Sequence, residues 1–380
     1  MDGTRGGPLA GLKVVELAGL GPAPFAAMLM ADLGAEVVRV DRPGGASPIG
    51  LADGMNRSRP NVAVNLKQPE GVEVVRRLLD GADVLIEGFR PGVLERLGLG
   101  PDECLARNPR LIYGRMTGWG QTGPWARSAG HDINYAAITG ALHLCGTAEK
   151  PIAPVNVLAD FGGGSLYLVI GILAALRSRE TSGAGQVVDA AMVDGAASLV
   201  TMLYGMHAAG LWQDRRGVNM LDGGLPFYDT YECADGKWVA VGALEPQFWA
   251  LLNERLGLTF ARGQNDPASF AEQRAAYEAA FRSRTRDEWA EVFADSDACV
   301  APVLSLAEAP SHPHLVARGT FTAAAGAVAP GVAPRFSGTP TAEPTPPRAA
   351  GADTTAYLQA SGFSGPEVED LLRSGAVVQG

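Results

Sequence analysis

The chain is 380 residues long, enough to bury a large core and to form two domains. Its formal net charge of −10 and isoelectric point near 5.1 argue against nucleic acid as a partner. Four cysteines without CxxC or metal-ligand spacing predict reduced thiols and no metal site. The first residues lack the apolar core of a signal peptide, and the last four are not a peroxisomal address. We therefore expect a cytoplasmic protein without a membrane partner.

The first third of the chain alternates short apolar runs with helical patterns. Strands are predicted over 12–17, 35–40, 62–65, 83–86 and 111–116, and helices over 24–33 and 70–79. This alternation indicates an α/β fold with a Rossmann-like, doubly wound parallel sheet. Further along, apolar helices are predicted over 165–177 and 192–208.

The character of the chain changes near residue 226. Runs at 228–233 and 238–241 flank an Ala-Asp-Gly connection that suits a β-hairpin. Helices are predicted over 246–255, 270–282, 286–294 and 364–374, with an extended segment over 323–350. We expect a large domain over 1–190 and 335–380, linkers over 191–225 and 317–334, and a smaller α+β domain over 226–316.

The first strand-turn-helix invites a dinucleotide-binding interpretation. Residues 19–24 (Gly-Leu-Gly-Pro-Ala-Pro) supply the first two glycines of G-x-G-x-x-G, and Asp41 ends the next strand. The match then fails, because a proline replaces the third glycine and two prolines remove backbone donors that a pyrophosphate would use. Arg39 and Arg42 flank Asp41 and suit a phosphorylated nucleotide better than a free ribose. Nicotinamide binding is therefore disfavoured.

Two short motifs each supply a group that can move a proton. They are residues 130–135 (Gly-His-Asp-Ile-Asn-Tyr), with His131, and residues 160–164 (Asp-Phe-Gly-Gly-Gly), with Asp160. An enzyme that inverts an acidic carbon needs one base on each face of it, and a partly buried aspartate can act near neutral pH. The simpler interpretation, a structural histidine and a capping aspartate, fits the same spacing.

Four further segments resemble the family III coenzyme A transferase superfamily, and the resemblance runs nearly end to end. They are 31–40 (ADLGAEVVRV), 87–93 (EGFRPGV), 113–120 (YGRMTGWG) and 188–195 (VDAAMVDG). Within that superfamily, residues 130–135 and 242–248 (GALEPQF) resemble the α-methylacyl-CoA racemase branch. The resemblance implies an interlocked homodimer with its active site between the large domain of one chain and the small domain of the other.

The resemblance also implies roles for individual residues. His131 is expected to be one base, with Glu245 fixing its tautomer, and Asp160 is expected to be the second base. Asn156 would hydrogen-bond Asp160 or order its loop. Backbone N–H groups of a turn over 160–164 at the start of the apolar helix would stabilise an enolate, with the Asp160 amide as the expected donor. The same geometry would serve an ordinary capped helix.

Substrate contacts follow from the same motifs. The expected contacts to coenzyme A in the large domain are Arg39, Arg42, Lys67, Arg90 and Arg96. The expected contacts to the acyl part are Met116, Met192, Met220, Leu221, Gly162 and Tyr135. Each also has a structural interpretation, as a solvated surface charge or as a core side chain.

Three functions remain in competition. The leading one is a cofactor-free racemase of fatty acid metabolism that interconverts (2R)- and (2S)-2-methylacyl-CoA through an enolate by two-base 1,1-proton transfer. The second is a CoA transferase that uses Asp160 as a nucleophile. The third, an acyl-CoA-binding protein without catalysis, is disfavoured because His131, Asp160 and Glu245 are all present.

Overall fold

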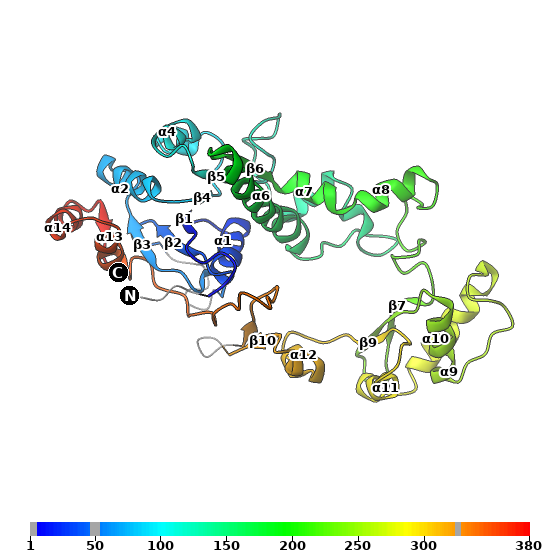
Figure 1. Ribbon diagram of the computed structural model, residues 1–380. Helices are drawn as coiled ribbons and strands as arrows, with labels where there is room; N and C mark the ends of the chain where they lie inside the picture. Colours follow the sequence, from blue (N-terminus) through cyan, green and yellow to red (C-terminus); the bar gives the residue numbers. More distant parts are fainter. Residues whose placement is uncertain (1–5, 46–53, 324–327) are drawn as a thin grey trace. The chain divides into compact units, whose positions relative to one another are not determined.

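The computed structural model describes residues 6–45, 54–323 and 328–380. Contacts divide the chain into two compact units (Figure 1). The first comprises 1–141, 154–200 and 313–380, and the second comprises 142–153 and 201–312.

The first unit is built on a seven-stranded sheet in the order β12-β3-β2-β1-β4-β5-β6. The strands are β1 Lys13–Leu17, β2 Glu36–Asp41, β3 Asn61–Val64, β4 Val84–Glu87, β5 Ile112–Thr117, β6 Gln186–Ala191 and β12 Val377–Val378. All neighbours pair in parallel except β12, which is antiparallel to β3. This order contains the Rossmann order 3-2-1-4-5-6, so the predicted α/β fold with a mostly parallel sheet is confirmed.

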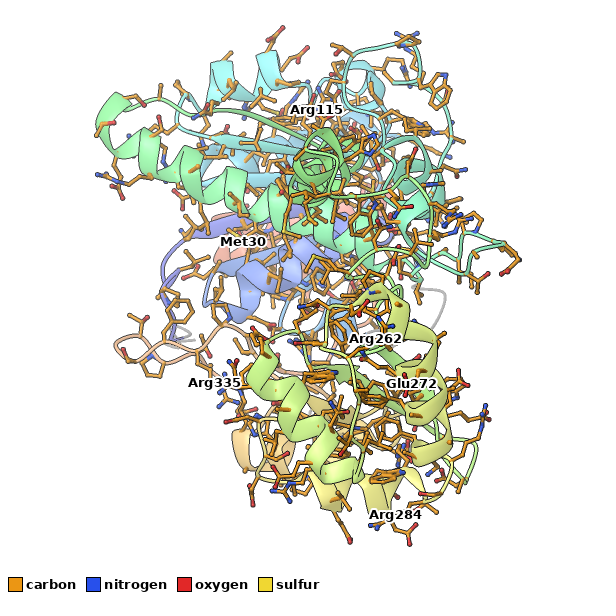
Figure 2. All side chains as sticks on the ribbon, turned by 90° about the vertical axis from the view of Figure 1, so that its right-hand side faces the viewer. Met30, Arg115, Arg262, Glu272, Arg284 and Arg335 are labelled. Carbon is orange, nitrogen blue, oxygen red and sulfur yellow. The ribbon has the colours of Figure 1, made fainter. Side chains whose placement is uncertain are left out.

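Helices of the first unit connect these strands. They are α1 Pro22–Asp32, α2 Pro69–Asp80, α3 Val93–Arg96, α4 Pro101–Arg107, α5 Asp132–Ile138, α6 Leu166–Ser182, α7 Met192–Leu199, α12 Pro313–Arg318, α13 Thr354–Ala360 and α14 Gly365–Ser374. Proline begins α1, α2 and α4, where its missing N–H costs no hydrogen bond. Met30 of α1 is fully buried inside the unit (Figure 2). Ser364 caps α14 through a capping box with Glu367, as its predicted start requires.

The second unit holds an antiparallel sheet of β7 Tyr228–Glu232, β8 Trp238–Gly242 and β9 Val300–Pro302. Its helices are α8 Thr201–Ala208, α9 Pro246–Leu256, α10 Phe270–Phe281 and α11 Arg286–Phe293. The predicted hairpin and the three predicted helices after it are confirmed. The single helix predicted over 192–208 is wrong, because α7 ends at Leu199 and α8 begins at Thr201.

Aromatic packing forms the core of the second unit. The rings of Tyr231 and Phe281 stack at 5.3 Å, and Trp289 meets Phe281 edge-on at 5.4 Å. Arg284, labelled in Figure 2, lies over the Trp289 ring at 5.0 Å. Such ring pairs add to the free energy gained from apolar burial.

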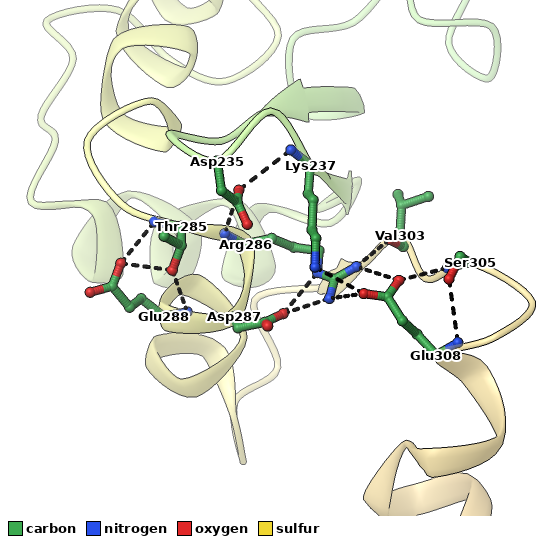
Figure 3. Close-up of polar contacts among 9 residues, drawn as sticks. All are labelled: Asp235, Lys237, Thr285, Arg286, Asp287, Glu288, Val303, Ser305 and Glu308. Atoms are coloured by element: carbon green, nitrogen blue, oxygen red, sulfur yellow. Dashed lines mark hydrogen bonds and ion pairs between the residues drawn. The ribbon is translucent and has the colours of Figure 1, made fainter.

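An ionic cluster joins the start of α11 to residues 303–308 in the same unit (Figure 3). The Arg286 side chain is only 4% exposed, and it donates to Glu308 at 2.9 Å and to Asp287 at 2.7 Å. It also donates to the Val303 carbonyl at 3.0 Å, while Lys237 reaches Glu308 at 2.9 Å. The hydrogen bond from Arg286 is the largest cause that holds the pKa of Glu308 well below its usual range.

We expect Arg286→Met to lower the thermal unfolding midpoint by a few degrees at neutral pH, because it removes these charge-assisted bonds. The folded-state pKa of Glu308 is depressed, so this stability is present above the ordinary glutamate pKa, about 4.3, and is lost as pH falls below it. Calorimetry at pH 7 and pH 3 should therefore show the two proteins converging in acid. Arg282→Met, at an exposed pair 3.7 Å from Glu232, is the control, and an equal effect there would contradict the prediction.

Candidate active site

A cavity of about 210 Å³ opens beside the carboxyl end of β5 and the first turn of α5. It gathers five residues that the sequence analysis singled out: Arg90, Met116, His131, Tyr135 and Met192. Gly88, Phe89 and Trp119 also line it. The first unit therefore brings one proposed base together with part of the proposed substrate surface.

His131 occupies the N-cap position of α5 and is exposed. Its backbone N–H donates to the Asn134 side chain at 3.1 Å, which fixes the start of the helix. Tyr135, one turn further on, is 6% exposed and packs edge-on against Trp119 at 4.7 Å. Burial is the main cause that raises the pKa of the Tyr135 hydroxyl to about 12, and the negative charge of Asp160 adds to it.

Asp160 lies inside a π-helix, η4 Val157–Ser165, that leads directly into α6. The prediction of a glycine-rich turn at this point is therefore wrong. π-Helices are rare and frequently occur at functional sites. Three consecutive glycines, residues 162–164, lie within this π-helix. Because they have no side chains, neighbouring segments can pack closely against it.

The glycines of η4 allow α7 to approach backbone to backbone. A Cβ on Gly163 would lie 2.5 Å from the Ala196 nitrogen, and a Cβ on Gly195 would lie 1.8 Å from the Gly163 carbonyl oxygen. No side chain larger than hydrogen fits such distances. Gly162 lies next to Leu199 of α7, and its contact with substrate stays a prediction.

The Asp160 carboxyl is half-buried, and several groups act on it. Burial is the largest cause that raises its pKa, and the negative charge of Asp132 raises it as well. The Asn156 amide, which donates to Oδ2 at 3.4 Å, and the charge of His131 act in the opposite direction. The net result is a raised pKa, the direction that a proton-transferring carboxyl needs.

The Asp160 amide does not serve as expected. Its N–H donates to Asp132 Oδ1 at 2.7 Å, and the neighbouring Ala159 N–H donates to the same oxygen at 2.7 Å. The expected enolate donor is thus already engaged, so that prediction is wrong for this structure. Asp132 belongs to the same motif as His131, but its sequence position predicted no role for it.

A larger cavity of about 670 Å³ lies at the carboxyl ends of β1, β2 and β3. Arg39, Arg42 and Lys67 line it, and Phe89 lines both cavities. Carboxyl ends of parallel strands at the switch point of the strand order are where such sheets bind ligands. Arg96 is exposed at the end of α3 and lines neither cavity.

The charged residues of the larger cavity differ in how much free charge they offer. Arg39 is 6% exposed and is paired with Glu16 at 2.6 Å and with Asp41 at 3.0 Å, so its charge is neutralised from within. Arg42 and Lys67 are exposed and form no ion pair within the described residues. They are better suited to contact an anionic ligand.

The remaining predicted residues belong to the second unit. Glu245 is exposed at the N-cap of α9, and its pairing with His131 stays a prediction. Met220 and Leu221 lie in a loop that Asn219 and Asp222 hold in place, with the Asn219 Nδ2 donating to Asp222 at 2.8 Å. Within the described part of the chain, no cluster of His, Cys, Asp and Glu side chains is arranged to hold a metal ion.

Comparison with known proteins gives a consistent result. The model of CoA-transferase family III matches residues 9–354. The chain is 46% identical over 369 residues to the α-methylacyl-CoA racemases of Mus musculus and Homo sapiens, covering 96% of this chain and 96% of each relative. A crystal structure of a CAIB/BAIF family protein from Brucella suis is 28% identical, with a TM-score of 0.82 over 94% of this chain and 100% of that one.

We expect Asn156→Ala to raise the pKa of Asp160 further, because the Asn156 amide stabilises the ionised carboxylate. The titration of the Asp160 carboxyl carbon, followed by ¹³C NMR, measures this directly. A midpoint equal to or below that of the parent would contradict the assigned hydrogen bond.

Proposed function

Because this chain belongs to CoA-transferase family III, we propose that it has the activity for which its mouse and human relatives are named, the interconversion of (2R)- and (2S)-2-methylacyl-CoA thioesters. The observation that carries the proposal is the placement of the two bases. His131 lines the smaller cavity, and its charge acts on the Asp160 carboxyl. An imidazole and a carboxyl of raised pKa are the pair that a 1,1-proton transfer requires.

In the proposed reaction, one base removes the proton from C2 of the thioester and the other returns it on the opposite face. By family resemblance, His131 faces the proton of the 2S epimer and Asp160 that of the 2R epimer. The raised pKa of Asp160 brings its protonated form closer to neutral pH, so that it can return a proton as well as accept one. No cofactor is needed beyond the coenzyme A part of the substrate.

The enolate formed between the two transfers needs hydrogen-bond donors. The first turn of α5 offers the N–H groups of Asp132 and Ile133, since the first N–H groups of a helix have no partner within it. They directly follow His131, at the end of the helix where the dipole favours negative charge. We propose them as donors in place of the engaged Asp160 amide.

Coenzyme A is proposed to bind along both cavities. Its phosphates would lie near Arg42 and Lys67 in the larger one, and its thioester would lie near His131 in the smaller one. Phe89, which borders both, would lie beside the connecting part of the ligand. Met116 and Met192 would offer the acyl chain an adaptable apolar surface.

We propose a homodimer on the basis of an apolar surface of the first unit. Leu166 and Ile170 of α6 are 45% and 61% exposed, and Val187 of the edge strand β6 is 39% exposed. The stretch Val157–Ser182 is apolar and long enough to cross a membrane, a test that core helices also pass. A second copy that covers this surface would explain its composition.

We further propose that the protein is cytoplasmic and acts in fatty acid metabolism.

In deuterated water without an acceptor acid, we expect a single 2-methylacyl-CoA epimer to gain deuterium at C2 and to approach an equal mixture of epimers. His131→Ala and Asp160→Ala should each slow epimerisation by about 10²- to 10⁴-fold, because each full turnover needs both groups. Mass spectrometry and chiral chromatography follow the two processes.

The competing function is a CoA transferase with Asp160 as nucleophile, the reaction for which the family is named. It would give no deuterium at C2, transfer of CoA to an added acid, and a covalent adduct on Asp160. That result would overturn the proposal in favour of the transferase. Epimerisation by either base variant at close to the parent rate would refute the assigned roles.

We also expect activity to return when inactive His131→Ala and Glu245→Ala chains are refolded together. If His131 pairs with Glu245 of the partner subunit, one of the two sites in a mixed dimer keeps both residues intact. Pairing within one chain would leave each site defective, and mixing would then restore nothing. A protein that sediments as a monomer in analytical ultracentrifugation under conditions where it is active would also contradict a site shared between subunits.

A further inference from the structure

We infer that Asp132 is a positioning residue, whose carboxylate holds the backbone of Asp160 against the helix that begins at His131 and places a negative charge beside the second base. This inference rests on the proposed function, because it assigns Asp132 a role in coupling the two proton transfers. It concerns a side chain to which neither the sequence motifs nor the proposed mechanism gave a task.

The contacts of Asp132 connect the two motifs. The residue is 4% exposed, and its Oδ1 accepts the N–H groups of Ala159 and Asp160, each at 2.7 Å. It follows His131 in the chain. One carboxylate oxygen therefore fixes the backbone of one base relative to the backbone of the other.

The charge of Asp132 is unusual among the buried carboxylates of the first unit. Glu16, Asp32 and Glu87 each contact an arginine, at 2.5 to 2.8 Å. Asp132 forms no ion pair within the described residues, and its Oδ2 is buried without a hydrogen-bond partner there. A buried oxygen left in this state costs free energy.

A neutral side chain could accept the same two N–H groups. In asparagine, Oδ1 would keep both bonds, and Nδ2 would replace an oxygen that makes none. These two hydrogen bonds, which we call the clamp, therefore do not explain why residue 132 is an aspartate. The negative charge has an effect that asparagine lacks, because it disfavours ionisation of the nearby Asp160.

The surroundings of Asp160 contain few other charges. From α5 it is faced by His131 and Tyr135, and from the segment before η4 by the neutral Asn156. The start of α1 offers Gly21, whose added Cβ would lie 3.6 Å from Asp160 Oδ2.

The helices beyond add no charge that offsets Asp132. Asp32 of α1 is paired with Arg57, Asp194 of α7 is exposed, and α6 carries its first charged residue at Arg177. Asp132 is thus the group next to Asp160 that opposes its ionisation by charge.

The decisive variant is Asp132→Asn, with Asp102→Asn on the exposed start of α4 as the matched loss of one charge. With the 2R epimer as substrate, for which Asp160 is the base, we expect the acid limb of the kcat/KM profile to move to lower pH in Asp132→Asn and to stay in place in Asp102→Asn. The ¹³C titration of the Asp160 carboxyl should move in the same direction. Unchanged profiles and titration would overturn the role of the charge.

Asp132→Ala tests the clamp, because it removes both hydrogen bonds. We expect epimerisation to fall by about 10²-fold relative to the parent, as for a misplaced catalytic group. Deuterium exchange at C2 should fall less, since either base can still remove a proton and return it on the same face. The ratio of exchange to epimerisation therefore rises, whereas partial unfolding would reduce both rates equally.

The outcomes separate this inference from the proposed function. Absence of exchange in the parent would refute the racemase, while the ¹³C titration of Asp160 in parent and Asp132→Asn would still decide the charge effect. An active parent with Asp132→Asn and Asp132→Ala indistinguishable from it would refute the inference alone. Equal losses of exchange and epimerisation in Asp132→Ala would refute the clamp.

Discussion

The position of Asp160 depends on a contact between two stretches of backbone. Gly163 of η4 and Gly195 of α7 approach so closely that a Cβ on either would overlap the other segment. This contact packs α7 against a π-helix, a conformation that is rare in proteins. The segment η4 is also tied to α5 by the two N–H bonds to Asp132. The geometry of the second base is thus set by glycines and by a carboxylate that do not themselves transfer protons.

The buried carboxylates of the first unit fall into two groups, those paired with an arginine and those that are not. Glu16, Asp32 and Glu87 are matched by arginines, so that their burial fixes the positions of strands and helices with little effect on chemistry. Asp132 and Asp160 lie close to one another, and burial raises the pKa of Asp160. The negative charge of Asp132 acts in the same direction as burial, so both disfavour ionisation of Asp160. This contrast between paired and unpaired carboxylates supports a role in proton transfer for the site around Asp160.

Much of the fold follows from local sequence signals, since five apolar runs became β1 to β5 and the Ala-Asp-Gly connection joins β7 to β8. Strand β6 escaped prediction because its first residues are exposed, and Val200 divides α7 from α8 without any glycine or proline to announce it. No sequence pattern distinguished the π-helix from a turn. Arg39 was recognised as basic, but only three dimensions show that Glu16 and Asp41 neutralise it.

The motif that contains His131 could be recognised from the sequence, but the role of the Asp132 side chain within it could not. An acidic residue in the first turn of a helix is expected on electrostatic grounds alone, and its sequence position suggested nothing else. Its actual partners lie 27 and 28 residues away, in a segment whose own glycines were the more visible feature. A two-base reaction constrains both groups at once, so its supporting residue must touch both segments. Such a residue can be identified only once the fold shows the two segments side by side. Asp132 stands out there because its charge is buried without an ion pair among the described residues.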